Sequence, residues 1–364
     1  MNTEFSTIPL NISNSILTIG PDYRNHRGGI GAVLEVYSKY FENFKFLASY
    51  KDGSDLYKSI YFFYILFIFI QRLVFDRSIR IVHIHGATRG SFARKFICFI
   101  IGKYIFGKKI IYHIHGAEYH LFYQESSPIV KKSIRMFINN SDNIFCLSEM
   151  WKRFFTSNFN PKKIEIVANI IDYPSVNKRH KESSVLNFLF LGQIGSRKGI
   201  FDLLEVLSKN KGKYNGKIKL TIGGNGEIEK LKAVIREKQI EGLVEFIGWV
   251  TNEKKINCLQ TADIYILPSY NEGLPISILE AMSFGQAIIA TNVGGIPEIV
   301  ITEKNGILIE PGNLIEIENA IDFFIKNPEK INSYGIKSKQ IVIKHMPDAV
   351  MMELSNIYKI LLNE

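Results

Sequence analysis

The chain has 364 residues, of which 46% are hydrophobic and 22% are charged. This length accommodates two domains, and the composition is that of a soluble globular protein, which excludes a disordered or low-complexity chain. The formal net charge of +10 is concentrated in the first part, where 22 Lys and Arg face 13 Asp and Glu through Asp172.

Short apolar segments alternate with helical stretches in this first part of the chain. Such alternation predicts a parallel β-sheet with helices on both faces. The expected strands cover residues 15–20, 79–85, 109–115, 143–148 and 163–169.

The longest uncharged apolar run covers residues 60–70 and is rich in aromatic side chains. Its eleven residues are fewer than the ~20 that a membrane-spanning helix needs. A second apolar segment, residues 96–111, is interrupted by Lys103, Lys108 and Lys109. An apolar stretch edged with basic residues is typical of a helix that lies on a lipid surface. A helix buried between the sheet and neighbouring helices would have the same sequence pattern.

The excess positive charge fits either an anionic membrane or nucleic acid as a partner, or simply a solvated surface. No motif that interleaves Arg with aromatic residues is present, which argues against nucleic acid. Three distant cysteines, Cys98, Cys146 and Cys258, and a polar start without a signal-peptide pattern favour the reduced cytoplasm. We therefore expect a cytoplasmic protein, peripheral on the inner face of the membrane.

A polar, charged stretch at residues 173–184 predicts a linker, after which the alternation restarts. The sequence thus predicts an α/β protein of two Rossmann-like domains, residues 1–172 and 173–347, facing across a cleft, with a helix over residues 348–364 that packs back on the first. The second set of strands is expected at residues 186–192, 218–223, 244–248, 262–268, 287–291 and 306–309.

A glycine-rich loop, residues 27–32, follows the first strand and opens a helix. Glycines let the backbone approach a phosphate, so Gly28 and Gly29 are candidate phosphate contacts. The loop lacks the spacing of a dinucleotide site, and no acidic residue closes the second expected strand. Both features argue against an NAD-dependent oxidoreductase.

Two strand ends repeat a His-Ile-His-Gly pattern, at residues 83–86 and 113–116. Alternation along a strand puts both histidines of each pair on one face of the sheet. A metal site is conceivable, but no carboxylate or cysteine joins the pattern at a suitable spacing. A histidine at the carboxyl end of a parallel strand points into the ligand crevice, so we expect His115 to contact the substrate, and His83 and His113 to be structural.

The second domain carries two loops suited to phosphate. Arg197 and Lys198 lie in a loop bounded by glycines after residues 186–192, and residues 223–227 form a further glycine-rich turn that includes Gly224. Arginine can grip a diphosphate with two hydrogen bonds, and lysine acts as a point charge. An exposed basic turn is the alternative for the first loop taken alone.

The most informative stretch is residues 271–282, in which Glu272 and Glu280 flank a loop that opens a helix near Pro275. Carboxylate oxygens accept hydrogen bonds from vicinal hydroxyls, and a helix start attracts phosphate. Together these features predict a nucleotide-sugar site.

In the order of these motifs the sequence resembles the family 4 retaining glycosyltransferases of the GT-B fold, from about Gly28 to Gly312. The element from Glu272 to Glu280, with Glu-Gly-Leu-Pro at its start, is the specific part. The resemblance implies catalytic roles for Glu272, Lys198 and His115. It also implies donor contacts from Gly28, Gly29, Arg197, Lys198, Gly224, Ile247, Val250, Glu272, Gly273, Leu274, Pro275 and Glu280.

Within this set, Lys198 and Arg197 would bind the diphosphate, Glu272 the sugar hydroxyls and Glu280 the ribose, while residues 247–250 would line the base pocket. The family often has an arginine where this chain has Gln193, so Arg197 is the candidate replacement. The resemblance implies retention, no metal or cofactor, and stabilisation of the leaving phosphate by cations and a helix start. Glu272 as a nucleophile is a minor alternative.

We expect a UDP-sugar donor more than a GDP-sugar. The expected acceptor is a lipid-linked glycan of bacterial surface polysaccharide, such as capsule, O-antigen or exopolysaccharide. Two alternatives stay open: a sugar-nucleotide 2-epimerase on the same fold, and a non-catalytic glycan-binding relative. The sequence does not define an oligomeric state.

Overall fold

A computed structural model describes residues 7–24, 28–51, 53–174 and 184–363. The chain divides into two compact units. The first comprises residues 1–172 and 344–364, and the second comprises residues 173–343. The stretch expected as a linker falls mostly on residues outside the described part, as does Arg27 of the glycine-rich loop.

The first unit is built on a six-stranded sheet in the order β2-β1-β3-β4-β5-β6, and each neighbouring pair is parallel. Chain order reverses between β1 and β3, which makes the carboxyl ends of these two strands the switch point of the sheet. The strands are β1 (Ile16–Pro21), β2 (Phe46–Tyr50), β3 (Ile81–Gly86), β4 (Lys109–Ile114), β5 (Asn143–Cys146) and β6 (Ile164–Ile166).

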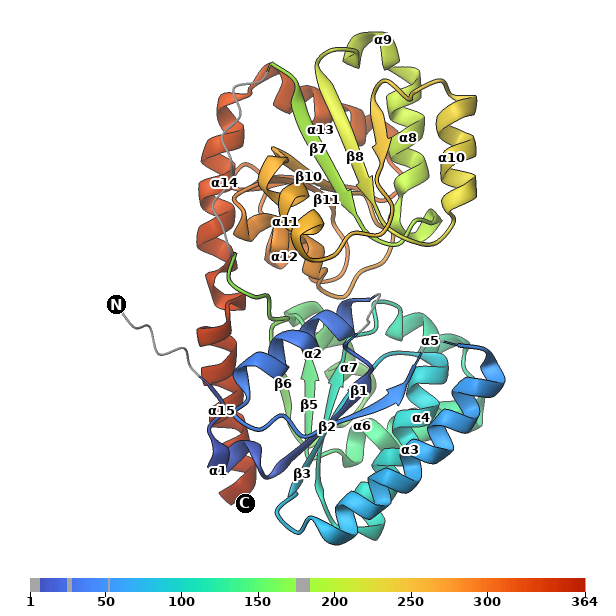
Figure 1. The fold of residues 1–364 in the computed structure, drawn as a ribbon, viewed down its shortest axis with the longest axis vertical. Coiled ribbons are helices and arrows are strands. Elements are labelled where there is room, and N and C mark those ends of the chain that lie inside the picture. Colours follow the sequence, from blue (N-terminus) through green and yellow to red (C-terminus); the bar gives the residue numbers. More distant parts are fainter. Residues whose placement is uncertain (1–6, 25–27, 52, 175–183, 364) are drawn as a thin grey trace. The chain divides into compact units, whose positions relative to one another are not determined.

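Helices connect these strands and cover the sheet. In Figure 1, α3 and α4 lie side by side, and the two helices are in contact. The helices of this unit are α1 (Leu10–Ser13), α2 (Gly29–Tyr40), α3 (Asp55–Phe75), α4 (Arg89–Ile100), α5 (Tyr119–Glu125), α6 (Pro128–Asn140), α7 (Glu149–Asn158) and α15 (Pro347–Asn363), with a π-helical turn at Ile101–Ile105.

Every strand expected in this part is present, although β6 is shorter than the expected 163–169. The strand β2 was not predicted. Its inward side chains are few, since only Leu47 and Ser49 are buried, and it forms an edge of the sheet. A short half-buried edge strand carries too little periodicity to stand out in the sequence.

The helix α3 is longer than the apolar run that predicted it, and by length and apolar composition alone its residues 57–75 could cross a membrane. One face of α3, with Phe62, Ile65, Phe69 and Leu73, is buried in the core of the first unit. The opposite face is exposed. The buried face agrees with the expectation of a helix packed against the sheet, and the expectation of a helix that lies on lipid stays a prediction.

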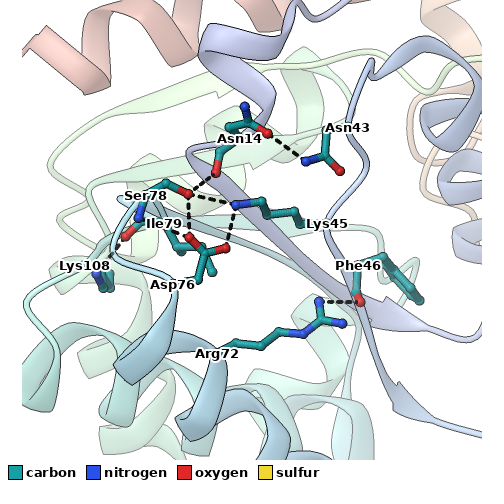
Figure 2. A network of polar contacts seen from close by, with 9 residues as sticks. All are labelled: Asn14, Asn43, Lys45, Phe46, Arg72, Asp76, Ser78, Ile79 and Lys108. Carbon is teal, nitrogen blue, oxygen red and sulfur yellow. Dashed lines mark hydrogen bonds and ion pairs between the residues drawn. The ribbon is translucent and has the colours of Figure 1, made fainter.

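A network of polar contacts fixes the carboxyl end of α3 to the sheet (Figure 2). Lys45 Nζ lies 2.6 Å from Asp76 Oδ2, and Ser78 Oγ donates to Asp76 Oδ1 at 2.6 Å. Arg72 Nη1 donates to the Phe46 carbonyl of β2 at 3.1 Å. Burial alone would raise the pKa of Asp76, but the hydrogen bonds from Lys45 and Ser78 outweigh it and lower the pKa. These contacts hold α3 in place as part of the first unit.

The second unit also contains a six-stranded sheet of parallel neighbours, in the order β12-β11-β10-β7-β8-β9. Chain order reverses between β7 and β10. The strands are β7 (Leu186–Leu191), β8 (Ile218–Gly223), β9 (Val244–Phe246), β10 (Ile264–Leu267), β11 (Ala287–Thr291) and β12 (Gly306–Ile309). The helices are α8 (Ile200–Lys209), α9 (Lys211–Tyr214), α10 (Ile228–Glu237), α11 (Asn252–Thr261), α12 (Ile276–Ser283), α13 (Leu314–Lys326) and α14 (Glu329–Val342).

The C-terminal helix α15 belongs to the first unit, where it contacts α1 and α2. The return begins slightly earlier than expected, because residues 344–347 also lie in this unit. His345 Nδ1 lies 3.0 Å from the Asn169 carbonyl, and the Ile171 amide donates to the His345 carbonyl at 3.0 Å. Further along α15, the Tyr358 hydroxyl lies 2.7 Å from His83 Nδ1 in the buried core.

Replacing Tyr358 by Phe removes the partner of His83 Nδ1 without changing the packing volume much. A buried polar atom left without a hydrogen bond costs about 1–3 kcal/mol. We therefore expect Tyr358→Phe to lower the melting temperature measured by calorimetry. The control Tyr104→Phe, at a residue that is 52% exposed, should leave it unchanged. Equal melting temperatures for both variants would show that the bond does not anchor α15.

Candidate nucleotide-sugar site

The loops that follow β7 and β10 meet at the switch point of the second sheet. In open parallel sheets, ligands bind at this point, outside the carboxyl ends of the strands. The first loop contains a short 3-10 helix, Ser196–Lys198, and the second runs through Glu272 into α12. Most of the predicted donor residues lie on these two loops.

An ion pair joins the two loops. Lys198 Nζ lies 2.5 Å from Glu272 Oε1, and the two side chains are only 13% and 6% exposed. Ser269 Oγ donates to the same carboxylate oxygen at 2.7 Å. A carboxylate as buried as Glu272 needs such donors, because desolvation of an unpaired charge costs several kcal/mol. The structure thus brings together two of the three residues predicted to be catalytic.

The loop that carries Lys198 ends at a glycine that no other residue can easily replace. Gly199 has φ +67°, and a Cβ atom there would lie 1.8 Å from the Pro268 carbonyl oxygen at the end of β10. The left-handed conformation and the absence of a side chain let the two loops touch. The contact places Lys198 beside the loop of Glu272.

Arg197 braces the same junction. Its Nη1 atom donates to the Asn271 carbonyl at 3.0 Å, and its own carbonyl accepts from the Tyr270 amide at 2.8 Å. The guanidinium therefore holds the loop that precedes Glu272. Gln193 is exposed; it occupies the position at which the family often has a phosphate-binding arginine.

The second predicted carboxylate, Glu280, lies on α12. Lys255 Nζ of α11 lies 2.6 Å from Glu280 Oε1, and the Glu280 side chain is 20% exposed. The helix α12 begins after Pro275, and no side chain caps its amino end among the described residues. The predicted contacts Gly273, Leu274 and Pro275 are buried in the loop that leads into it.

Backbone hydrogen bonds connect the loops that follow β7, β8 and β9. The Gly192 amide donates to the Gly223 carbonyl at 3.0 Å, and the Gly224 amide donates to the Gly248 carbonyl at 2.9 Å. A Cβ atom on Gly224 would lie 1.9 Å from the Gly192 carbonyl oxygen, so only glycine allows this approach. Of the residues predicted for the base pocket, Val250 is buried and Ile247 is half-buried.

The remaining predicted residues, Gly28, Gly29 and His115, belong to the first unit. Gly28 precedes α2 in extended conformation, and Gly29 is its first residue. His115 directly follows β4, and its Nε2 atom lies 3.0 Å from His85 Nδ1. The Asn169 side chain lies beside the His115 ring and favours a higher pKa for it, although burial dominates. The two contacts fix the orientation of this imidazole.

Four histidines, His83 and His85 of β3, His113 of β4 and His115 directly after β4, form an array of neighbouring rings. Burial lowers the pKa of His83 and of His115 to about 3, and it holds the pKa values of His85 and His113 well below the ordinary value. The array is therefore uncharged at neutral pH. Nitrogen atoms of His83, His85 and His113 lie within 4.8 Å of one another, but the His83 and His113 rings are parallel within 4°. Among the described residues, no carboxylate or cysteine joins these three histidines.

Several contacts of the site were missed in the sequence. Lys255, which bonds Glu280, lies in a polar helix without a recognisable motif. Ser269 follows Pro268 in the motif order, but its bond to Glu272, three residues later, was not predicted. The Gly294-Gly295 pair after β11 was also missed, although the Gly295 amide donates to the Gly273 carbonyl at 2.7 Å. A second glycine-rich turn at a strand end was the available signal for this contact.

The family models for "Glycosyltransferase Family 4" and "Glycosyl transferases group 1" match residues 46–173 and 175–346. An uncharacterized glycosyltransferase of Methanocaldococcus jannaschii is 30% identical over 267 residues, which cover 69% of this chain and 68% of that protein. A UDP-Gal:α-D-GlcNAc-diphosphoundecaprenol α-1,3-galactosyltransferase of Escherichia coli is 25% identical over 69% of this chain and 68% of its own length.

Solved structures share the fold of the whole chain. The Anabaena protein HepE, crystallised with UDP and glucose, superposes with a TM-score of 0.73 at 14% identity, covering 95% of this chain and 99% of that one. At this identity the likeness concerns the fold, which is GT-B, with two α/β domains on parallel sheets.

We expect Lys198→Met to destabilise the second unit strongly, because it leaves the buried Glu272 carboxylate without its cation. Removing one member of a buried pair costs about 3–5 kcal/mol. The matched control is Lys230→Met, which breaks the exposed pair with Glu227 and costs about 0–1 kcal/mol. Urea denaturation of both variants measures the difference.

The double variant Lys198→Met/Glu272→Leu removes both charges and should recover most of the lost stability. If Lys198→Met instead unfolded at the same urea concentration as Lys230→Met, the pair would not hold the two loops together.

Proposed function

This chain belongs to the family 4 glycosyltransferases, and on that basis we propose that it transfers a sugar from a UDP-sugar to a hydroxyl group of a lipid-linked glycan. The single observation that carries the donor half of the proposal is the buried pair of Lys198 and Glu272 at the switch point of the second sheet. It sets a cation and a hydrogen-bond acceptor side by side, as a sugar diphosphate requires.

In the proposed complex, Lys198 contacts the diphosphate and Glu272 accepts hydrogen bonds from the sugar hydroxyls. The two donors to Glu272 among the described residues, Lys198 and Ser269, both use Oε1, so Oε2 would meet the sugar. Glu280 would hold the ribose hydroxyls. The amino end of α12 adds positive potential near the phosphates, because no side chain of the described residues caps it.

Negative charge develops on the phosphate oxygen as the bond to the anomeric carbon breaks. Lys198 and the start of α12 would stabilise this charge, which is electrostatic catalysis without a metal ion. We propose that the acceptor attacks from the face that the nucleotide leaves, so that the configuration is retained and the leaving phosphate takes the proton. Arg197 would act mainly by holding the loop of Glu272, since it bonds the Asn271 carbonyl.

The proposed acceptor rests on the relatives and on the surface of the first unit. The name of the Escherichia coli relative specifies a diphosphoundecaprenol acceptor, which is a lipid that bears a diphosphate. A lipid-linked acceptor in bacterial surface polysaccharide assembly would place this enzyme at the inner face of the cytoplasmic membrane.

We propose that the exposed face of α3 is the part of the first unit that meets the membrane. Ile60, Phe63, Tyr64 and Phe67 on this face are each about 60–70% exposed. Such a large apolar patch on one helix marks an interaction site. Because α3 is fixed to the sheet through its other face and through the polar network at its end, we propose that it lies on the lipid and does not span it (Figure 2).

The donor proposal predicts that UDP raises the melting temperature of the protein more than GDP, ADP or CDP does, in buffer that contains EDTA. Glu280→Ala should weaken the affinity for UDP at least ~10-fold, because a hydrogen bond to a charged group contributes about 1.5–3 kcal/mol. The control Glu329→Ala removes an exposed carboxylate of α14 and should bind UDP as the wild type does. A larger shift with GDP would reassign the base, and a shift that needs Mg²⁺ would contradict metal independence.

The membrane proposal predicts that the protein floats with vesicles that contain phosphatidylglycerol. Phe63→Gln/Phe67→Gln should reduce the bound fraction at least ~10-fold, because each buried phenyl ring contributes about 1.5–3 kcal/mol. Ile315→Gln, which changes a residue of the second unit that is 72% exposed, is the control. A wild type that stays in the soluble fraction would remove the proposal.

A further inference from the structure

A lysine interrupts the core-facing stripe of α4. Phe92, Lys95 and Phe99 follow one another at helical spacing, and all three are buried, with Lys95 only 1% exposed. Lys95 forms no hydrogen bond or ion pair with any residue that the structure describes. Burial and the neighbouring Arg94 lower the pKa of Lys95 to about 7. An ammonium in this position destabilises the fold unless an anion joins it.

A second cation lies beside it. Arg94 is half-buried, and its guanidinium carbon lies 5.0 Å from the centre of the Tyr50 ring. Its Nε atom is buried and has no hydrogen-bond partner among the described residues. Lys58 of α3 approaches the same ring, with its Nζ atom 5.9 Å from the centre. Two cations, Arg94 and Lys58, thus meet at the Tyr50 ring where β2 ends, and Lys95 is the next residue after Arg94 on α4. Neither Arg94 nor Lys95 is paired with a carboxylate in the described part of the chain.

Arg94 and Lys95 lie on the helix that follows the switch point of the first sheet, which is where ligands bind in such folds. The helix α4 begins directly after β3, at the switch point of the first sheet, and helical side chains lean toward the amino end of their helix. The charge of Lys95 contributes to the lowered pKa of His85, the residue that contacts His115. The ammonium group therefore lies near the carboxyl ends of β3 and β4.

We propose that Arg94 and Lys95, with Lys58 and Tyr50 beside them, bind the phosphate groups of the lipid-linked acceptor. This inference rests on the proposed function and deepens it by naming the residues that recognise the acceptor. A diphosphate supplies the anionic oxygens that two adjacent cations lack. The exposed apolar face of α3 starts near Lys58, at Tyr57 and Ile60, and provides a path for the hydrocarbon chain.

The probe for this site is farnesyl diphosphate, a soluble isoprenoid diphosphate, with farnesol and inorganic pyrophosphate as comparators. Calorimetric titration should show that the wild-type protein binds farnesyl diphosphate at least ~10-fold more tightly than either comparator. Arg94→Gln and Lys95→Met should each weaken this binding at least ~10-fold. The matched control is Lys152→Met/Arg153→Gln, an adjacent pair of basic residues on α7 of the same unit.

The Lys95→Met variant also separates a binding role from a structural role. A lysine that stabilises the fold would lower the melting temperature when replaced. An unpaired buried lysine should raise it. Because the folded state has a pKa of about 7 against the usual 10.5, the gain should be largest below pH 7 and should shrink as the pH rises toward 10.5.

The outcomes are decisive for the site. Unchanged binding of farnesyl diphosphate in both variants, or equal loss in the α7 control, would overturn the proposal. So would variants that lose flotation with phosphatidylglycerol vesicles but keep farnesyl diphosphate binding, because the cations would then bind phospholipid headgroups. UDP binding, measured in parallel, distinguishes this failure from failure of the donor proposal: a protein that binds UDP but not the diphosphate probe keeps its donor site.

Discussion

The second unit depends on one buried ion pair, between Lys198 and Glu272. Each residue comes from a loop on one side of the switch point, and neither charge is stable at such low exposure without the other. The glycine at 199 lets the loops approach closely enough for the pair to form. The requirement to neutralise these two charges therefore determines where the loops lie, and with them the start of α12.

The same pair explains why the site suits a sugar diphosphate. A lone lysine would bind any anion, and a lone carboxylate would be protonated or solvated at such a depth. Held together and bonded by Ser269, they present a cation to phosphate and an acceptor to hydroxyl groups. Glu280, paired with Lys255 on the next helix, repeats this arrangement for a second set of hydroxyls.

The charges of the first unit are arranged differently. Its histidine array is neutral, and its cations exceed its carboxylates. Arg94 and Lys95 are partly or fully buried without a carboxylate among the described residues, in contrast to Lys198. A paired lysine maintains a site in the absence of ligand, whereas an unpaired one lowers stability until an anion arrives. This contrast is the physical basis for assigning donor binding to one unit and acceptor binding to the other.

Much of this organisation was predictable from local sequence. Buried parallel strands appear as continuous apolar runs, as in β10 and β11. The strands from β7 to β12 were all expected, although β8 and β9 each include an exposed residue. Glu272, Glu280 and Lys198 follow strand ends, which is where ligands bind. The partners of these residues were not predictable. Lys255 meets its carboxylate through tertiary packing, and the bond between His85 and His115 joins β3 to the residue that follows β4. Ser269 is the exception, since it is only three residues from Glu272.

The edge strand β2 and the exposed face of α3 also could not be predicted from the hydrophobic pattern of the sequence. The half-buried strand has few inward side chains. In α3 the exposed and buried faces are both apolar, so the hydrophobic pattern does not reveal which one packs on the sheet. Only the three-dimensional contacts separate a core face from a binding face.

The most direct test of the account compares the dissociation constants of UDP and of a UDP-sugar in the wild type and in Glu272→Gln. The account assigns Lys198 to the diphosphate and Glu272 to the sugar. It predicts that the substitution weakens UDP-sugar binding at least ~10-fold more than UDP binding, because both ligands meet the altered loops but only the UDP-sugar loses a charged acceptor. Equal loss for both ligands, or no loss for either, would contradict it.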